Sequence, residues 1–111
     1  MVTHLVLIKP RLDSSARERL VAAFERALAE IPTIRNVRVG RRITHGAGYE
    51  AGMPDTADYL VMIDFDDADG LATYLHHPAH VDLGAHFAES LAGALVYDFE
   101  EVGLKNLRDL R

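Results

Sequence analysis

The sequence predicts an α+β protein built in the order β-α-β-β-α-β around an antiparallel sheet. Two observations carry this prediction. Residues 2–9 and 58–65 are apolar on both sides, as expected of strands in the middle of a sheet, and residues 15–30 show a helical stripe of apolar side chains. The expected elements, in chain order, are 2–9 (strand), 15–30 (helix), 36–43 (strand), 58–65 (strand), 66–91 (helix in two pieces) and 94–102 (strand).

The first strand has no polar face. Leu5 and Leu7 point to one side of it, while His4, Val6 and Ile8 point to the other. Because neither side is suited to water, we expect both faces of this strand to be covered.

The first helix carries signals at both ends. Ser15 and Glu18 form an S-x-x-E pattern, which predicts a capping box at the start, and Pro32 ends the helix. The apolar stripe between them consists of Leu20, Phe24, Leu28 and Ile31. This spacing buries one face of the helix.

Residues 36–43 alternate between apolar and polar side chains, which is typical of an edge strand. Residues 44–57 contain three glycines and Pro54, so we expect an irregular loop longer than a hairpin requires. Residues 58–65 are again apolar on both sides. They form the second central strand.

The second helical segment is interrupted. Asp66 is expected to cap a short helix that runs through Tyr74, Pro78 restarts the helix at a favoured first-turn position, and Gly93 stops it. A last strand at 94–102 completes a ferredoxin-like fold, in which the first and third strands are central.

The two helices of such a fold cover only one face of the sheet. The other face carries the apolar side chains of the central strands together with Leu95, Tyr97 and Phe99. Since exposed apolar surface of this extent favours association, we predict a homodimer in which two sheets pair into a dimeric α/β barrel.

Length and composition narrow the class of protein. A chain of 111 residues fits one domain, which we place at residues 1–102, followed by a C-terminal tail at 103–111 that packs on the dimer mate. A net charge of −5 disfavours nucleic acid and anionic membranes as partners. The absence of cysteine excludes disulfides and thiolate chemistry. Without a signal segment, the expected location is cytoplasmic.

Three of six histidines cluster at positions 76, 77 and 80, just after Tyr74. A metal site is disfavoured because Pro78 interrupts the helix and breaks the i, i+4 face that His76 and His80 would share. Acid–base chemistry needs only one neutral imidazole near a phenol, with His80 accepting a proton and Tyr74 orienting or donating one. A capping histidine beside a packed tyrosine is the structural alternative.

His4 begins an otherwise aliphatic strand, so its imidazole needs a hydrogen-bond partner inside the protein. Tyr59, at the start of the other central strand and on the same face, is one candidate, and a role in lining a pocket is the other. Residues 46–51 match the pattern G-x-G-x-x-A, but Gly52 and Pro54 oppose the helix that nucleotide binding requires there.

These residues resemble the stress-responsive A/B barrel domain (Dabb) family of dimeric α+β barrels. The resemblance covers residues 2–100. It rests on the segments 3–9, 31–40, 74–80 and 96–99, which read THLVLIK, IPTIRNVRVG, YLHHPAH and VYDF.

Polyketide cyclases of this family close a linear polyketide by aldol condensation without metal or organic cofactor. The resemblance places their catalytic pair at His80 and Tyr74, and implies no metal and no cofactor here. It also implies a pocket between sheet and helices lined by His4, Tyr59, Val6, Ile8, Phe24, Val37, Val61 and Val96. Tyr59 stands where the cyclase pocket has a second histidine, and the loop at 44–57 is several residues longer.

The function expected from this resemblance is a cofactor-free cyclase, isomerase or lyase that acts on a hydrophobic, polyketide-like carbonyl compound by His/Tyr acid–base chemistry. The alternative is a non-catalytic stress-related or ligand-binding barrel. An open apolar cavity beside both side chains favours the enzyme. A filled interior with the imidazole bonded to backbone favours the alternative.

Overall fold

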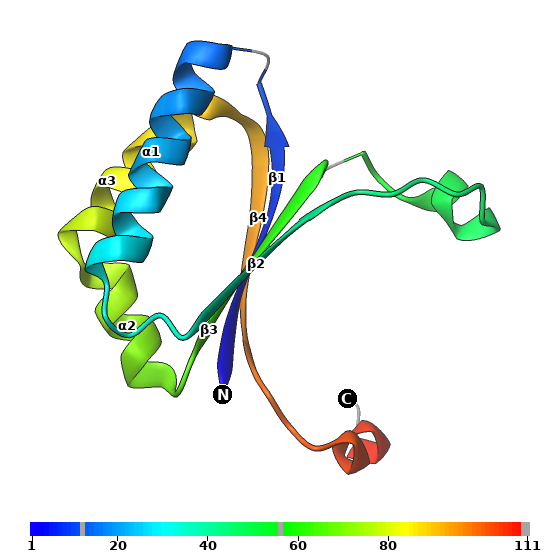
Figure 1. Ribbon diagram of the computed structural model, residues 1–111. Coiled ribbons are helices and arrows are strands. Elements are labelled where there is room, and N and C mark those ends of the chain that lie inside the picture. Colours follow the sequence, from blue (N-terminus) through cyan, green and yellow to red (C-terminus); the bar gives the residue numbers. More distant parts are fainter. Residues whose placement is uncertain (12, 56, 110–111) are drawn as a thin grey trace.

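The computed structural model describes residues 1–11, 13–55 and 57–109 (Figure 1). Its elements are β1 (Val2–Pro10), α1 (Ser14–Glu30), β2 (Asn36–Arg41), η1 (Gly48–Gly52), β3 (Tyr59–Phe65), α2 (Ala68–His76), α3 (Pro78–Ser90), β4 (Leu91–Glu100) and η2 (Leu104–Asp109). The predicted order of strands and helices is confirmed, with short 3₁₀ helices added at η1 and η2.

The four strands form one antiparallel sheet in the order β2-β3-β1-β4. The two strands predicted to be apolar on both sides, β1 and β3, are central. Residues directly opposite each other share a face, so the pair His4 and Ile63 and the pair Val6 and Val61 point to the same side. The ferredoxin-like α+β fold predicted from the sequence is confirmed.

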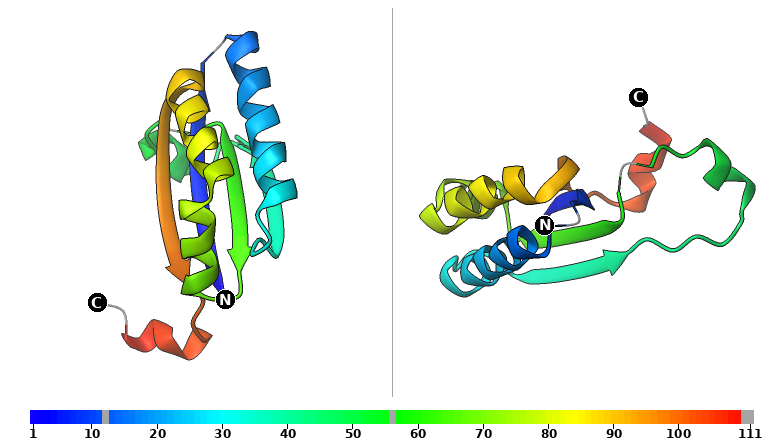
Figure 2. Two further views of the ribbon diagram at one scale, coloured as in Figure 1. Left: turned by 90° about the vertical axis from the view of Figure 1, so that its left-hand side faces the viewer. Right: turned by 90° about the horizontal axis from the view of Figure 1, so that it is seen from above.

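All three α-helices lie on one side of the sheet (Figures 1 and 2). The buried core between helices and sheet is built mainly from alanines of α1, large apolar side chains of β3 and the Tyr74 ring. Its members are Ala23, Ala27, Ile31, Ile63, Phe65, Tyr74, Ala79 and Leu83. Small residues on α1 allow it to pack closely against α3, and Phe65 is completely buried.

Element boundaries differ from the prediction at the caps. Asp13, not Ser15, caps α1, because its carboxylate accepts hydrogen bonds from the backbone N–H groups of Ser15 (2.9 Å) and Ala16 (3.2 Å). Asp67, not Asp66, caps α2 by accepting from Gly70 N–H at 2.8 Å. In both cases several acidic or hydroxyl side chains compete for one position, and the local backbone selects among them.

The last strand begins earlier than predicted. Leu91 follows α3 directly in extended conformation, so β4 already includes Gly93 rather than starting after it. Gly93 pairs with Lys9 at the point where the register of β1 shifts. Gly93 therefore lies beside an irregularity in the pairing of β1 with β4, and it does not end the helix.

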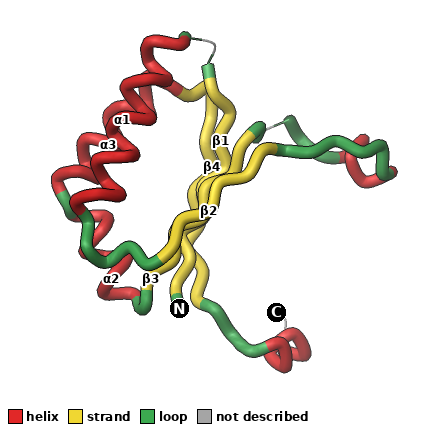
Figure 3. Tube along the Cα trace, viewed as in Figure 1, coloured by secondary structure: helices red, strands yellow, loops and turns green. Residues whose placement is uncertain are grey.

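No α-helix of the described residues lies on the second face of the sheet, which we call the open face (Figure 3). Its apolar side chains lie on the central strands, at Leu5, Leu7, Leu60 and Met62, and on β4, at Leu95, Tyr97 and Phe99. The exposed fractions of the β4 residues are 39%, 48% and 55%. This agrees with the prediction that the open face is apolar.

Two segments project from the sheet on the side of the open face (Figure 1). One is the loop after β2, which contains η1 where we expected only irregular structure. The other is the tail, in which Leu104 and Leu107 are exposed, whereas Leu110 lies outside the described residues. Within the residues that can be described, no helix is long and apolar enough to cross a membrane.

Candidate functional site

A cavity of about 510 Å³ lies between the helices and the helix-covered face of the sheet. Its walls come from α1, α2, α3 and all four strands. The lining residues are His4, Val6, Ile8, Leu20, Val21, Phe24, Val39, Tyr59, Val61, Ile63, Tyr74, Leu75, His80, Leu83, Gly84, Phe87 and Val96. Most are apolar, and no Lys, Arg, Asp or Glu is among these described lining residues.

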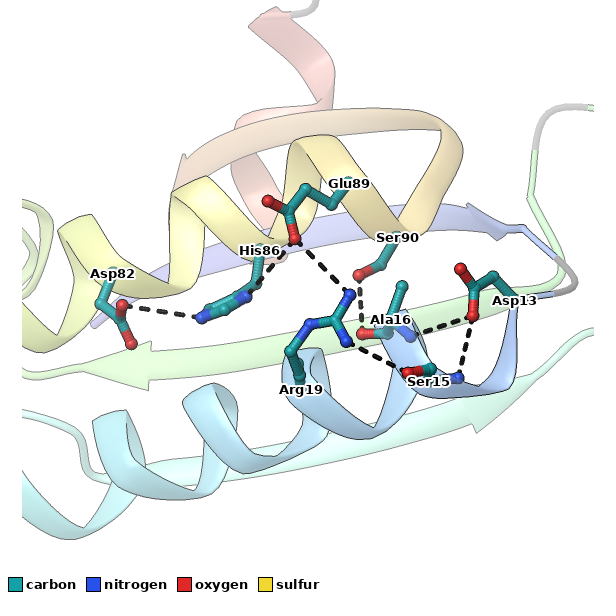
Figure 4. A network of polar contacts seen from close by, with 8 residues as sticks. All are labelled: Asp13, Ser15, Ala16, Arg19, Asp82, His86, Glu89 and Ser90. Carbon is teal, nitrogen blue, oxygen red and sulfur yellow. Dashed lines mark hydrogen bonds and ion pairs between the residues drawn. The ribbon is translucent and has the colours of Figure 1, made fainter.

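The helical wall of the cavity is held together by polar contacts between α1 and α3 (Figure 4). The hydroxyl of Ser90 donates a hydrogen bond to the carbonyl oxygen of Ala16 at 2.9 Å, and both groups are buried. Farther along, Arg19 and Glu89 approach within 3.9 Å at the surface. This buried hydrogen bond holds the first turn of α1 against the end of α3, because breaking it would leave a hydroxyl and a carbonyl unpaired.

Tyr74 lies in the last turn of α2 and is 2% exposed. Its ring contacts three others, with centroid distances of 5.2 Å to Phe65, 5.5 Å to His4 and 4.6 Å to His80. Burial, and secondarily the negative charge of Asp98, raises the pKa of Tyr74 to about 12. The phenol therefore keeps its proton at neutral pH and is available to donate a hydrogen bond.

His80 lies in the first turn of α3. The break between α2 and α3 places it there, because His77 caps α3 with its imidazole and Pro78 occupies the first turn. The Nδ1 atom of His80 is 3.0 Å from the carbonyl oxygen of Leu75. A carbonyl can only accept, so Nδ1 carries the proton and Nε2 of the neutral ring keeps its lone pair.

The surroundings of His80 favour its neutral form. Burial lowers its pKa most, and the nearby His4 adds to this effect, while the hydrogen bond to Leu75 opposes it. The net direction is downward from the ordinary value. A neutral imidazole beside a protonated phenol is the combination that proton abstraction next to a carbonyl requires.

His4 is buried and satisfied, but not by the partner proposed from the sequence. Its Nδ1 lies 2.6 Å from a carboxylate oxygen of Asp98 on β4. Tyr59 cannot reach it, because the strands are antiparallel and Tyr59 pairs with Ile8 at the far end of β1. Both His4 and Tyr59 nevertheless line the cavity.

Of the other pocket residues expected from the resemblance, all but Val37 line the cavity. Val6, Ile8, Phe24, Val61 and Val96 line the cavity together with the His80 and Tyr74 pair.

Val37 does not line the cavity. It pairs with Ile63 and packs against the core, and Val39, two residues along β2, lines the cavity instead.

Sequence reasoning missed several cavity residues on the helices and, on the sheet, Val39, Ile63 and the His4 partner Asp98. Phe87 and Gly84 follow His80 at helical spacings on α3, so a helical projection that starts at His80 would have found them. Asp98 shares a face with Val96 by strand alternation, but its pairing with His4 depends on which strand neighbours β1. Among the described residues, no group of three or more His, Asp or Glu side chains is placed to hold a metal ion.

Fold and site together define a ferredoxin-like α+β protein with an apolar cavity between its sheet and helices. The chain belongs to the Stress Responsive A/B Barrel Domain (Dabb) family, whose sequence profile matches residues 2–101. This match agrees with the resemblance read from the sequence.

Three proteins illustrate what this chain is similar to in sequence or structure. Olivetolic acid cyclase from Cannabis sativa is 21% identical over 100 residues, covering 88% of this chain and 94% of the cyclase. A dimeric ferredoxin-like protein of unknown function from Thermobifida fusca is 25% identical with a TM-score of 0.67, covering 90% of each chain. The hydroxynitrile lyase from Passiflora edulis is 12% identical with a TM-score of 0.73, covering 92% of this chain and 95% of the lyase.

Proposed function

We propose that this protein is an enzyme that moves protons on a hydrophobic carbonyl compound, with His80 as general base and Tyr74 as oxyanion donor. The observation that carries the proposal is the adjacency of these two rings, 4.6 Å between centroids, on the wall of an open apolar cavity. A cyclase and a lyase occur among the similar proteins. This supports the class of a cyclase, lyase or isomerase.

In the proposed step, Nε2 of His80 takes a proton from the carbon next to the carbonyl. The electron pair of that C–H bond moves toward the carbonyl, and the developing oxyanion accepts a hydrogen bond from the Tyr74 hydroxyl. The resulting imidazolium then returns its proton to the enolate or to a leaving oxygen. Since the pKa of Tyr74 is raised to about 12, the phenol donates this bond without losing its proton.

The cavity indicates which substrates fit. Its lining offers hydrogen-bonding groups only at histidines and tyrosines and no cation that would pair with a carboxylate or phosphate. Burial of an unpaired anion there would be costly. We therefore expect a neutral compound with a carbonyl head and an apolar body.

One observation supports a second candidate, a binding protein without catalysis. The hydrogen bond from His80 to the Leu75 carbonyl is the contact that a purely structural imidazole would make. The bond occupies only Nδ1, however, and the cavity is not filled by side chains. We therefore rank the enzyme first.

A series of straight-chain 2-alkanones, from butanone to dodecanone, tests the kind of ligand. Thermal shift measurements should show stabilisation that grows with chain length until the cavity is full, because each buried methylene contributes about 0.8 kcal/mol. The matching alkanoates should stabilise less at neutral pH. Equal or stronger stabilisation by the alkanoates would contradict the proposed neutral ligand. Mass spectrometry of compounds extracted from the purified protein identifies a candidate natural ligand.

The pH dependence of kcat/KM follows from His80. Its pKa is lowered, so the neutral base persists below the ordinary histidine value of about 6.5, and we expect the acid limb of the profile to lie below that pH. The unfolded chain binds this proton at the ordinary pKa, so His80 also makes the fold less stable as pH falls through that range. An acid limb centred above pH 7 would contradict the assignment.

We also propose that the chain forms a homodimer through its open face. Leu5, Leu7, Tyr97 and neighbouring side chains form a contiguous apolar surface that no part of the described chain covers. The Thermobifida fusca protein, which has the same fold, is dimeric. Burial of this surface against a second copy removes apolar area from water at about 25 cal/mol per Å².

A further inference from the structure

Residues 43–55, which we call the arm, display large apolar side chains to solvent. Ile43, Tyr49 and Met53 are 78%, 64% and 54% exposed. The arm stands away from the helices, on the side of the open face (Figures 1 and 3). Three large apolar side chains exposed on one projecting segment indicate a site of contact with another surface.

The arm has a defined shape of its own. The carboxylate of Glu50 accepts hydrogen bonds from the backbone N–H groups of His45, at 3.0 Å, and of Gly46. The hydroxyl of Tyr49 lies 2.8 Å from Nε2 of His45, and the two rings meet edge to face. The apolar side chains are therefore presented on a braced loop, which reduces the ordering cost of docking.

Ion pairs fasten the base of the arm to the sheet. Asp55 lies 2.9 Å from Nζ of Lys9 on β1 and 3.4 Å from the guanidinium of Arg42. The hydrogen bond and charge of Lys9 lower the pKa of Asp55, and Asp55 in turn raises the pKa of Lys9. These pairs join the end of the arm to β1 and to the residue that follows β2.

The arm and the open face form one continuous surface. A groove of about 380 Å³ runs between them, with Leu7 and Leu60 of the open face on one side and Met53 and Pro54 of the arm on the other. A body that covers the open face at this end of the sheet therefore meets the arm as well.

The isolated chain exposes more surface than a compact monomer. Its accessible area is 7671 Å², whereas a monomer of 12.3 kDa is expected to expose about 6,100 Å². The radius of gyration is 15.6 Å, against about 13 Å expected for 111 residues. The excess exceeds the roughly 800 Å² per partner of a standard interface. The surplus surface is therefore large enough to supply a dimer interface.

We infer that the arm is a dimer clasp, whose apolar side chains pack against a second copy of this chain. The inference rests on the proposed homodimer and adds a second contact surface to the open face. Because a two-fold interface is self-complementary, each subunit both contributes an arm and receives one. The groove is then filled by the partner rather than by solvent.

The chain has no cysteine, so one introduced thiol reports on one position. Met53→Cys is compared in two backgrounds: the otherwise unchanged dimer, and a monomer made by Met62→Glu with Tyr97→Glu. Met62 and Tyr97 both lie on the open face, outside the groove. We expect Ellman's reagent to react at least about tenfold more slowly in the dimer, because the partner buries the thiol. Ile43→Cys, elsewhere on the arm, repeats the measurement.

Val81→Cys on α3, on the helix side, is the control, since Val81 is 64% exposed and remote from the open face. Its reaction rate should be equal in both backgrounds. If both arm thiols react equally fast in dimer and monomer, the clasp is wrong and the homodimer stands. If the unchanged protein already sediments as a monomer, both proposals fail.

Discussion

Replacing His80 with alanine is expected to lower kcat/KM by about 10² to 10⁴, which is the usual contribution of a general base. The change leaves the fold intact, because His80 is only half-buried and its hydrogen bond goes to a carbonyl at the end of α2. The measurement is the rate of deuterium incorporation next to the carbonyl of a ketone that binds in the thermal shift series. Rates for the variant and the unchanged protein are compared at ketone concentrations well below KM, where the rate reports kcat/KM.

His76→Ala is the matched control. His76 belongs to the same histidine cluster, but its imidazole bonds the Ala72 carbonyl at the surface and does not line the cavity. Tyr74→Phe keeps the packing and removes only the donor, so we expect a loss of about 10² to 10³. Full activity in His80→Ala would contradict His80 as the general base. Ketone binding without deuterium incorporation in the unchanged protein would leave the binding protein as the remaining candidate.

The second large effect is expected from Leu7→Glu combined with Met62→Glu on the open face. Two carboxylates per subunit, four in the dimer, would enter an apolar interface without partners, and each such burial is strongly unfavourable. We expect a folded monomer over the micromolar range in which the unchanged protein is dimeric. Sedimentation equilibrium measures this directly, and circular dichroism checks that the fold is retained.

Ala22→Glu combined with Val81→Glu adds the same charge on exposed positions of α1 and α3. This control should remain dimeric. A dimer that persists in the open-face variant would show that the subunits associate through another surface.

The fold follows from local patterns in the sequence to a large extent. β1 and β3 are apolar on both faces and therefore central, whereas β2 alternates and lies at an edge. Pro32 follows the end of α1, and Pro78 begins α3. Both prolines act on the backbone locally, so the sequence indicates these boundaries. Ser15 and Asp66 are not the caps that the sequence predicts, because neighbouring Asp side chains compete for the same backbone N–H groups and the three-dimensional path of the chain decides between them.

The candidate site shows the limit of such reasoning. The proximity of Tyr74 and His80 is local, since both lie around one helix break, and the sequence indicates it. The partner of His4 is not local, because it depends on strand register: Asp98 is its neighbour and Tyr59 is four positions away along β1. Val37 and Val39 share a face, so alternation alone could not tell which one reaches the cavity.

The arm was the least predictable segment. Its glycines and Pro54 indicate a loop, and Gly46 does adopt a positive φ of 80°. The short helix η1 depends instead on the side chains of Glu50, His45 and Tyr49, which brace it through contacts within five residues. The ion pairs that join Asp55 to Lys9 and Arg42 connect residues far apart in the sequence in the case of Lys9, so local patterns do not indicate them.

A crystal structure of the protein with a bound 2-alkanone tests the proposed chemistry most directly. The proposal predicts the carbonyl oxygen within hydrogen-bond distance of the Tyr74 hydroxyl, the adjacent carbon next to Nε2 of His80, and the alkyl chain among Val61, Val96 and Phe87. A ketone bound with its alkyl end against His80 and its carbonyl facing solvent would contradict it.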